Sequence, residues 1–190
     1  MNASEYLVAL NKALGQIDLE ALGEVCTEIQ QVKAWGGILY LLGNGGSQTN
    51  ASHLVLHLIN LGYKAHDLMS ETAWVTACAN DHSWQSTPAR RLSLVGRSGD
   101  ALLVFSGSGN SPNVLNALQE AKRKGMVTMG LLGFGGGFAL QFCEYAVVLA
   151  QKDYGICEDA HSAIVHILAN SLVNWGKYQD PKKQGIALAK

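Results

Sequence analysis

Five short, largely apolar runs constrain the fold of this chain more than any other feature of its sequence. Each run has five or six residues, and most are followed directly by Gly or Ser. Strands that are buried on both faces of a parallel sheet have continuous apolar runs rather than alternating ones. The runs that we predict to be strands are residues 37–42, 64–69, 101–105, 127–132 and 146–150.

Segments of helical periodicity lie between and around these runs. Apolar residues recur at helical spacing in residues 49–61, 86–95, 112–123 and 138–143. Residues 4–33 predict one helix, or two with a break near Gly15, and a last helix is expected from about Glu158 to Trp175. Alternating strands and helices are typical of a doubly wound α/β sandwich, with helices on both faces of a parallel sheet.

The length of 190 residues fits one domain. We expect a helical segment over about residues 1–34, a sheet core over about 35–175 and a polar tail over 176–190.

Charged residues are scarce, and this excludes some functions. They make up 15% of the chain, against about 25% in a typical domain. The net charge of −1 argues against a protein that binds nucleic acid through its phosphates. With 48% hydrophobic residues, so few charges leave an apolar surface, and we interpret this as a sign of self-association.

The cysteines and the apolar stretches indicate a cytoplasmic protein without a membrane partner. The four cysteines are scattered with no Cys-x-x-Cys spacing, which in a domain of this size favours reduced thiols over disulfides. The longest apolar stretches are too short to cross a bilayer, and the N-terminal region does not resemble a signal peptide.

Two glycine- and serine-rich loops follow the first and third predicted strands. They are Gly43-Asn44-Gly45-Gly46-Ser47 and Ser106-Gly107-Ser108-Gly109-Asn110-Ser111. Ligands of doubly wound sheets bind beyond the carboxyl ends of the strands, where helix N-termini present backbone N–H groups. The second loop lacks Lys and Arg, so its hydroxyls and amides suit the phosphate of a sugar better than a nucleoside triphosphate. The alternative is that both loops are only tight turns between a strand and a helix. The later glycine-rich run at 133–137 offers no hydroxyls, and we interpret it as a structural turn of this kind.

Four side chains that can bind a metal occur at helical spacings. His53 and His57 are four residues apart and therefore share a helix face. Glu158 and His166 are eight apart, which places them within about 80° of each other, whereas His161 is rotated from His166 by roughly 140°. His53, His57, Glu158 and His166 together predict a zinc site; the alternative is that each histidine belongs to the core or to an interface.

Taken in order, these motifs resemble the sugar isomerase (SIS) domain family, and within it the bacterial phosphoheptose isomerases. The resemblance covers about residues 35–175 and also includes Ala79-Asn80-Asp81. It implies a five-stranded sheet of flavodoxin-like order, a long N-terminal helix, and a homotetramer with active sites between subunits. It also implies isomerisation of sedoheptulose 7-phosphate to D-glycero-D-manno-heptose 7-phosphate, often with zinc.

The same resemblance implies roles for individual residues. Asn44, Gly45, Gly46 and Ser47 correspond to sugar-phosphate contacts, Asn80 and Asp81 to hydroxyl contacts, Ser106, Gly107, Ser108 and Ser111 to the phosphate cradle, and His53 and His166 to metal ligands. His166 also matches a proton-transfer residue of the family.

Three positions depart from the family pattern. His57 stands where the family has a Glu that serves as base and ligand, Glu158 replaces a Gln, and Leu61 replaces an Arg. The set of metal-binding groups survives these exchanges, but the identity of the base does not.

Aldose–ketose interconversion through an enediol needs a base that also acts as an acid, and a group that stabilises the oxyanion. We expect Zn²⁺ to hold the carbonyl and hydroxyl oxygens while Glu158 or His166 moves the proton, with His57 able to exchange roles with Glu158. The alternatives are a non-catalytic SIS protein that binds a sugar phosphate or a protein such as the replication initiator, and an isomerase of another sugar phosphate.

Overall fold

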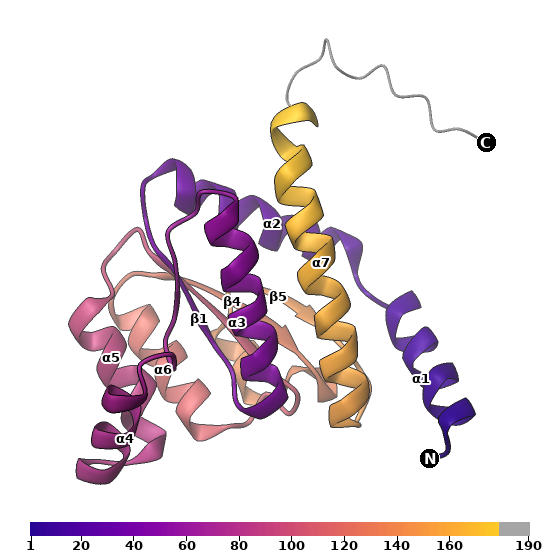
Figure 1. Ribbon diagram of the computed structural model, residues 1–190, viewed down its shortest axis with the longest axis horizontal. Helices are drawn as coiled ribbons and strands as arrows, with labels where there is room; N and C mark the ends of the chain where they lie inside the picture. The colour runs from indigo at the N-terminus through magenta and orange to yellow at the C-terminus, as the bar shows by residue number, and fades with distance from the viewer. Residues whose placement is uncertain (179–190) are drawn as a thin grey trace.

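The computed structural model describes residues 1–178, with side chains up to residue 173. Its centre is a five-stranded parallel sheet in the order β2-β1-β3-β4-β5, which confirms the predicted α/β architecture (Figure 1). Every predicted run overlaps one strand. The strands are β1 (Leu39–Leu42), β2 (Ala65–Asp67), β3 (Ala101–Ser106), β4 (Val127–Leu132) and β5 (Tyr145–Val148).

Seven α-helices and two 3₁₀ segments connect and flank these strands within the described residues. The helices are α1 (Ala3–Gly15), α2 (Leu19–Ala34), α3 (Gly45–Asn60), α4 (Thr72–Asp81), α5 (Thr87–Val95), α6 (Pro112–Arg123) and α7 (Tyr154–Tyr178). The 3₁₀ segments are η1 (Trp84–Ser86) and η2 (Phe134–Phe142). The predicted break near Gly15 is confirmed, because α1 ends there and the Asp18 side chain caps the start of α2.

Three expectations about the helices need correction. Helix α4 was not among the predicted helices. The helix predicted over residues 138–143 is instead the end of η2, whose three consecutive glycines have non-helical backbone angles. The last helix begins at Tyr154, ahead of the expected Glu158, and the polar tail beyond residue 178 lies outside the described residues.

Helices cover both faces of the sheet, so alternate strand residues enter two separate cores. Leu39 and Leu41 of β1 pack with α2, α3 and α7, whereas Tyr40 and Leu42 pack with α5 and α6. Such two-sided burial explains the continuous apolar runs of the strands. Helix α1 lies outside these layers, against α7 (Figure 1).

Two further observations concern the whole described region. All four cysteines are free thiols. None of the helices in this region has the length and apolar character needed to cross a bilayer.

His161 is fully buried and does not join the cluster formed by His53, His57 and His166, as its rotation away from His166 predicts. Its ring meets that of Phe105 edge-on, with centroids 6.0 Å apart, and neither ring nitrogen has a hydrogen-bond partner in the described chain. Burial lowers the pKa of His161 from 6.5 to about 4, because the charged imidazolium is poorly solvated there.

We therefore predict that His161 weakens the folded state in mild acid. The unfolded chain takes up a proton below pH 6.5 while folded His161 stays neutral down to about pH 4, so stability falls across that window as the pH falls. At pH 5 this contribution amounts to about 2 kcal/mol. Urea unfolding of the wild type and of His161→Leu at pH 7.5 and pH 5 measures it. His161→Gln serves as a second variant, and exposed His82→Gln as the control. Equal losses of stability in the wild type and both His161 variants would contradict the prediction.

Candidate active site

The order of the strands places the two glycine- and serine-rich loops side by side. The chain runs from β1 outward to β2 and then returns to β3 on the other side of β1. Helices α3 and α6 therefore leave β1 and β3 on opposite faces of the sheet, and a crevice opens between their N-termini. The Asn44 and Asn113 side chains bridge this crevice through two reciprocal amide hydrogen bonds of 2.9 and 2.8 Å.

The loop after β3, residues 106–111, is arranged to donate hydrogen bonds to an anion. We call it the serine loop. Ser106 Oγ accepts from the Gly109 N–H at 3.0 Å, and Ser108 Oγ accepts from the Asn110 N–H at 3.2 Å. Because both hydroxyl oxygens act as acceptors within the loop, their hydrogens remain available to a ligand. Ser111 precedes Pro112 at the start of α6 and makes no side-chain capping bond.

A pocket of about 70 Å³ lies against the serine loop. It is small enough to suggest a single anionic group rather than a sugar ring or a nucleobase. No Lys or Arg is among the described residues that form it. The lining residues are Asn44, Ser47, Phe105, Ser106, Gly107, Ser108, Ser111, Tyr154 and Glu158.

The loop after β1 differs from the serine loop, because a carboxylate of the same chain already occupies its helix N-terminus. Glu158 Oε1 of α7 accepts from the Ser47 N–H at 3.0 Å and from Ser47 Oγ at 3.4 Å. Asn50 Nδ2 also donates to the Glu158 carbonyl oxygen at 2.8 Å. A side chain at Gly46 would collide with the Glu158 carboxylate in its present position. Of the two loops, the serine loop is the one whose donors are not paired with a carboxylate.

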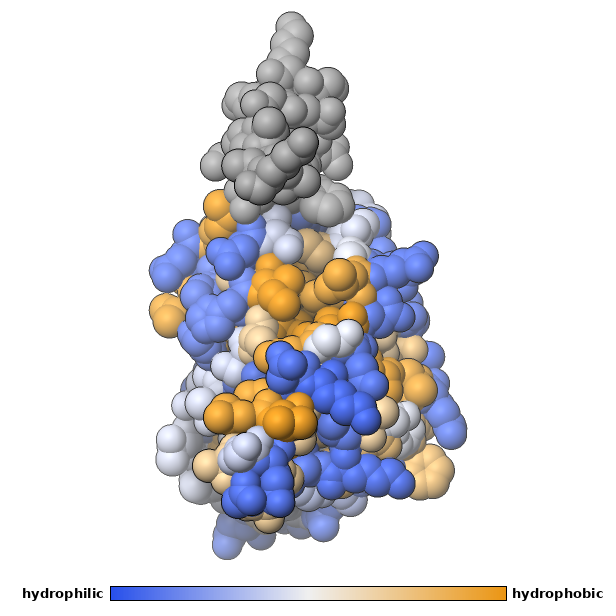
Figure 2. All heavy atoms as spheres, turned by 90° about the vertical axis from the view of Figure 1, so that its right-hand side faces the viewer, coloured by the Kyte–Doolittle hydropathy of each residue, from blue (hydrophilic) through white to orange (hydrophobic). Residues whose placement is uncertain are grey.

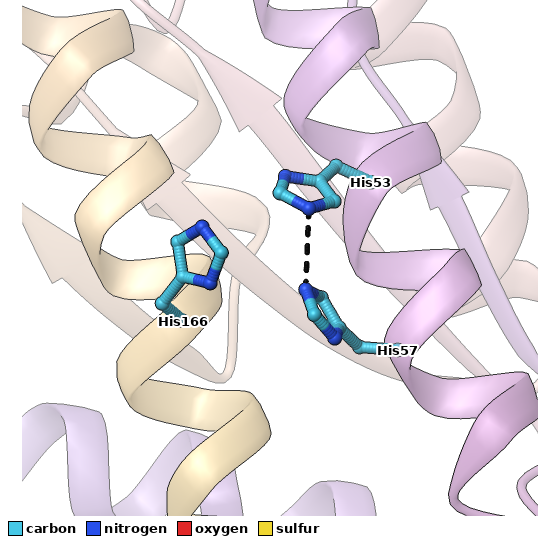
Figure 3. Close-up of side chains that lie close together, drawn as sticks. All are labelled: His53, His57 and His166. Carbon is cyan, nitrogen blue, oxygen red and sulfur yellow. Dashed lines mark hydrogen bonds between the residues drawn. The ribbon is translucent and has the colours of Figure 1, made fainter.

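Three of the four predicted metal-binding residues come together on the facing sides of α3 and α7. Figure 3 shows His53 and His57 on one helix and His166 on the other, and one ligand atom from each lies within 4.8 Å of the other two. His53 Nε2 and His57 Nε2 are 3.2 Å apart. Burial, followed by the neighbouring His53 and His166 rings, lowers the pKa of His57 and so favours the neutral imidazole that binds metals. We call these three residues the histidine triad.

Glu158 is not part of the histidine triad in this structure. It precedes His166 on α7 by eight residues, which corresponds to about 12 Å along the helix axis. Its side chain bonds to Ser47 instead. The predicted four-residue set thus separates into a triad and a carboxylate beside the serine loop.

Asn80 and Asp81 lie apart from both groups. They form the last residues of α4, are exposed, and bond to each other through Asn80 Nδ2 and Asp81 Oδ1 at 2.9 Å. Neither lines the pocket at the serine loop.

Tyr154 is a pocket residue that sequence reasoning missed. It lies four residues before Glu158, on the same side of α7, and helical spacing would have indicated it had the helix been predicted to start there. The expected start at Glu158 hid this relation.

A larger hollow of about 600 Å³ lies at the other end of the strands, near the amino-terminal ends of β1 and β3. Two of its cations have structural partners: Lys64 donates to the carbonyl of Gly36, and Arg91 pairs with Glu71. Ligands of open parallel sheets bind at the carboxyl ends of the strands, so we place the candidate site at the serine loop.

Comparisons with known proteins identify the family of the chain. The family model described as "SIS domain" matches residues 5–133. The chain is 37% identical to the phosphoheptose isomerase of Desulfovibrio desulfuricans over 153 residues, covering 77% of this chain and 73% of that protein. It is 33% identical to the probable phosphoheptose isomerase of Thermoplasma volcanium over 176 residues, covering 90% of each.

A solved structure supports the same fold. The phosphoheptose isomerase of Neisseria gonorrhoeae superposes with a TM-score of 0.85 at 24% identity, covering 90% of this chain and 94% of that one. From its family match, its relatives and its fold, the chain belongs to the SIS domain family and resembles the phosphoheptose isomerases of that family.

Proposed function

We propose that this protein is a phosphosugar isomerase that converts sedoheptulose 7-phosphate into D-glycero-D-manno-heptose 7-phosphate. The observation that carries the proposal is the pocket that combines the uncharged serine loop with the carboxylate of Glu158. An isomerase of a phosphorylated sugar requires an anion site for the phosphate and a proton-transfer group that reaches the reacting carbons. The names of the relatives supply a phosphorylated heptose, and the 7-position of the phosphate comes from the family resemblance.

The serine loop would hold the substrate's phosphate. Ser106, Ser108 and Ser111 offer hydroxyl donors, and the loop leads directly into the N-terminus of α6. Helix N-termini favour anions through their free N–H groups and the helix dipole. The loop after β1 would contact the sugar through Asn44, Gly45 and Gly46 rather than bind the phosphate, because Glu158 occupies its Ser47 N–H.

We assign proton transfer to Glu158. Its Oε1 is held by Ser47, whereas Oε2 has no hydrogen-bond partner among the described residues. A carboxylate with one oxygen anchored and the other open can take a proton from one carbon and return it to the next. His57 and His166, the other two catalytic candidates, are assigned to metal binding instead, since a nitrogen lone pair that binds a metal cannot also accept a proton.

The histidine triad has the donor set of a zinc site. Two nitrogens bound about 2.0–2.1 Å from one tetrahedral zinc ion lie roughly 3.3 Å apart. The His53–His57 nitrogen separation of 3.2 Å fits that spacing, and the third donor comes from His166. A bound zinc ion would polarise the substrate's oxygen atoms as a Lewis acid.

We further propose that the chain assembles into a homotetramer, with active sites between subunits. Leu7 and Val8 of α1 are 65% and 68% exposed, and Leu56 and Ile59 of α3 are each 55% exposed. Figure 2 views the α1 side of the molecule and shows apolar residues gathered in patches there. A second copy of the chain would remove these apolar side chains from water, which is the main driving force for association.

The first prediction from the proposed function concerns Glu158. Glu158→Gln is expected to lower turnover by about 10²- to 10⁴-fold, because the amide cannot accept the proton. The measurement is solvent deuterium uptake into sedoheptulose 7-phosphate, together with the zinc content of the protein. Asp159→Asn removes the same charge from the neighbouring exposed residue and is expected to retain activity.

Each outcome has a distinct meaning. Lost uptake with unchanged zinc supports Glu158 as the base. Lost zinc would mean that Glu158 turns to the triad as a fourth ligand. Full activity in Glu158→Gln would refute the assignment, and sugar-phosphate binding without uptake in the wild type would favour the non-catalytic alternative.

The second prediction concerns the histidine triad. His53→Ala and His166→Ala are each expected to reduce bound zinc from about one ion per chain to a small fraction, since two remaining imidazoles form a weak site. Elemental analysis of protein purified with added zinc measures this. His82→Ala, an exposed histidine outside the triad, should retain the metal. Undiminished zinc in both triad variants would contradict the prediction.

The third prediction concerns assembly. A Leu7→Glu, Val8→Glu double variant is expected to shift the protein to a smaller species, because each charge would have to leave water at the interface. Light scattering coupled to size-exclusion chromatography reports the mass. Leu94→Glu on α5 introduces a charge at a comparably exposed apolar position and serves as the control. A tetrameric mass in the double variant, or a monomeric wild type, would rule out this interface.

A further inference from the structure

Tyr154 forms one wall of the pocket at the serine loop. It is the first residue of α7, and its ring lies over Gly107, in the middle of the loop. A Cβ atom at Gly107 would come within 2.7 Å of Tyr154 Cδ1 and 3.1 Å of Cε1. A side chain at this position would therefore have to displace the ring, and the ring and the loop form one surface.

Phe134 supports this ring from behind. The Phe134 and Tyr154 ring centroids are 4.8 Å apart, with the planes tilted by 45°. Phe134 has a φ of 52° and is the only non-glycine residue of the described chain with a positive φ. Side chains rarely adopt that conformation, and residues held in it cluster at ligand sites. Its N–H bonds to the Gln151 carbonyl, while the Gly133 N–H bonds to the Ser106 carbonyl, so Phe134 is anchored next to the serine loop.

The pocket at the serine loop offers an anion no positively charged partner among its described lining residues. A phosphate in it would meet only neutral donors and the nearby carboxylate of Glu158, because no cation is among the described lining residues. Hydrogen bonds from neutral donors to an anion gain strength when water is kept away from them. The wall that Tyr154 adds to the pocket is apolar along its ring, and its hydroxyl makes no hydrogen bond within the described chain.

We propose that Tyr154 is a substrate-binding residue whose ring, supported by Phe134, packs over the phosphate in the serine loop and shelters its hydrogen bonds from water. The inference rests on the proposed function insofar as the ligand is a sugar phosphate. It assigns the contribution to the ring and not to the hydroxyl, since the ring atoms are the part of Tyr154 that contacts the loop.

The test compares Tyr154→Phe and Tyr154→Ala in the full chain. Calorimetric titration of sedoheptulose 7-phosphate into metal-free protein measures binding without turnover. Tyr154→Ala is expected to weaken binding about tenfold, and Tyr154→Phe to stay within about twofold of the wild type. Trp35→Ala removes an exposed aromatic side chain near the amino-terminal ends of the strands, and this variant should bind the sugar phosphate as the wild type does.

Phe134→Gly separates support of the ring from general stability. Glycine adopts the positive φ freely, so the relief of the backbone offsets part of the lost packing. Binding is expected to weaken about threefold while the thermal midpoint changes little. In the zinc-loaded enzyme, Tyr154→Ala should raise KM by the factor seen in the titration and leave kcat within about twofold.

Several results would overturn the inference. They are unchanged binding in Tyr154→Ala, an equal loss in Tyr154→Phe, and a wild type that binds no phosphate monoester. Tyr154-dependent binding in a protein that never interconverts the sugars supports the inference and refutes the isomerase proposal. Interconversion with an unchanged KM in Tyr154→Ala refutes the inference and leaves the isomerase proposal standing.

Discussion

The pairing of β1 with β3 is the constraint on which the rest of this structure depends. Because β2 lies on the far side of β1, the helices that follow β1 and β3 diverge to opposite faces of the sheet. Their N-termini then border one crevice, where free N–H groups and serine hydroxyls converge. Helix α7 packs beside α3, and we call the contact between these two helices the seam. One end of the seam brings Glu158 and Tyr154 to the crevice, and further along it His166 meets His53 and His57. A different strand order would leave the same residues scattered.

The features that could be predicted from the sequence are those set by local pattern. Continuous apolar runs predicted all five strands, since two-sided burial leaves little room for polar residues. The spacing of His53 and His57 predicted their shared face. Local pattern could not place the Glu158 side chain, because its partner Ser47 is more than a hundred residues away in the chain. Nor could it reveal the positive φ of Phe134, whose N–H bonds to the Gln151 carbonyl seventeen residues further along the chain.

The position of Glu158 gives the departures from the family pattern a physical meaning. A carboxylate at the N-terminus of α3 pairs with a free N–H and with the positive end of the helix dipole. At the other end of the seam, three imidazoles can form a site without a carboxylate, and so carry no negative charge of their own. The negative charge of the seam therefore lies next to the serine loop and not at the histidines. An anionic ligand in that loop has Glu158 as its nearest charged neighbour among the described lining residues.

The paired amides of Asn44 and Asn113 have a consequence for how the crevice responds to a ligand. They connect the first turn of α6, which begins at the serine loop, to the residue that precedes α3. Three residues beyond Asn44, the same helix holds the Glu158 carboxylate through Ser47. A continuous set of hydrogen bonds thus runs from the first turn of α6 through Asn44 and α3 to the carboxylate that would move the proton. The two walls of the crevice are therefore joined directly, and a ligand between them would contact elements that are already hydrogen-bonded to each other.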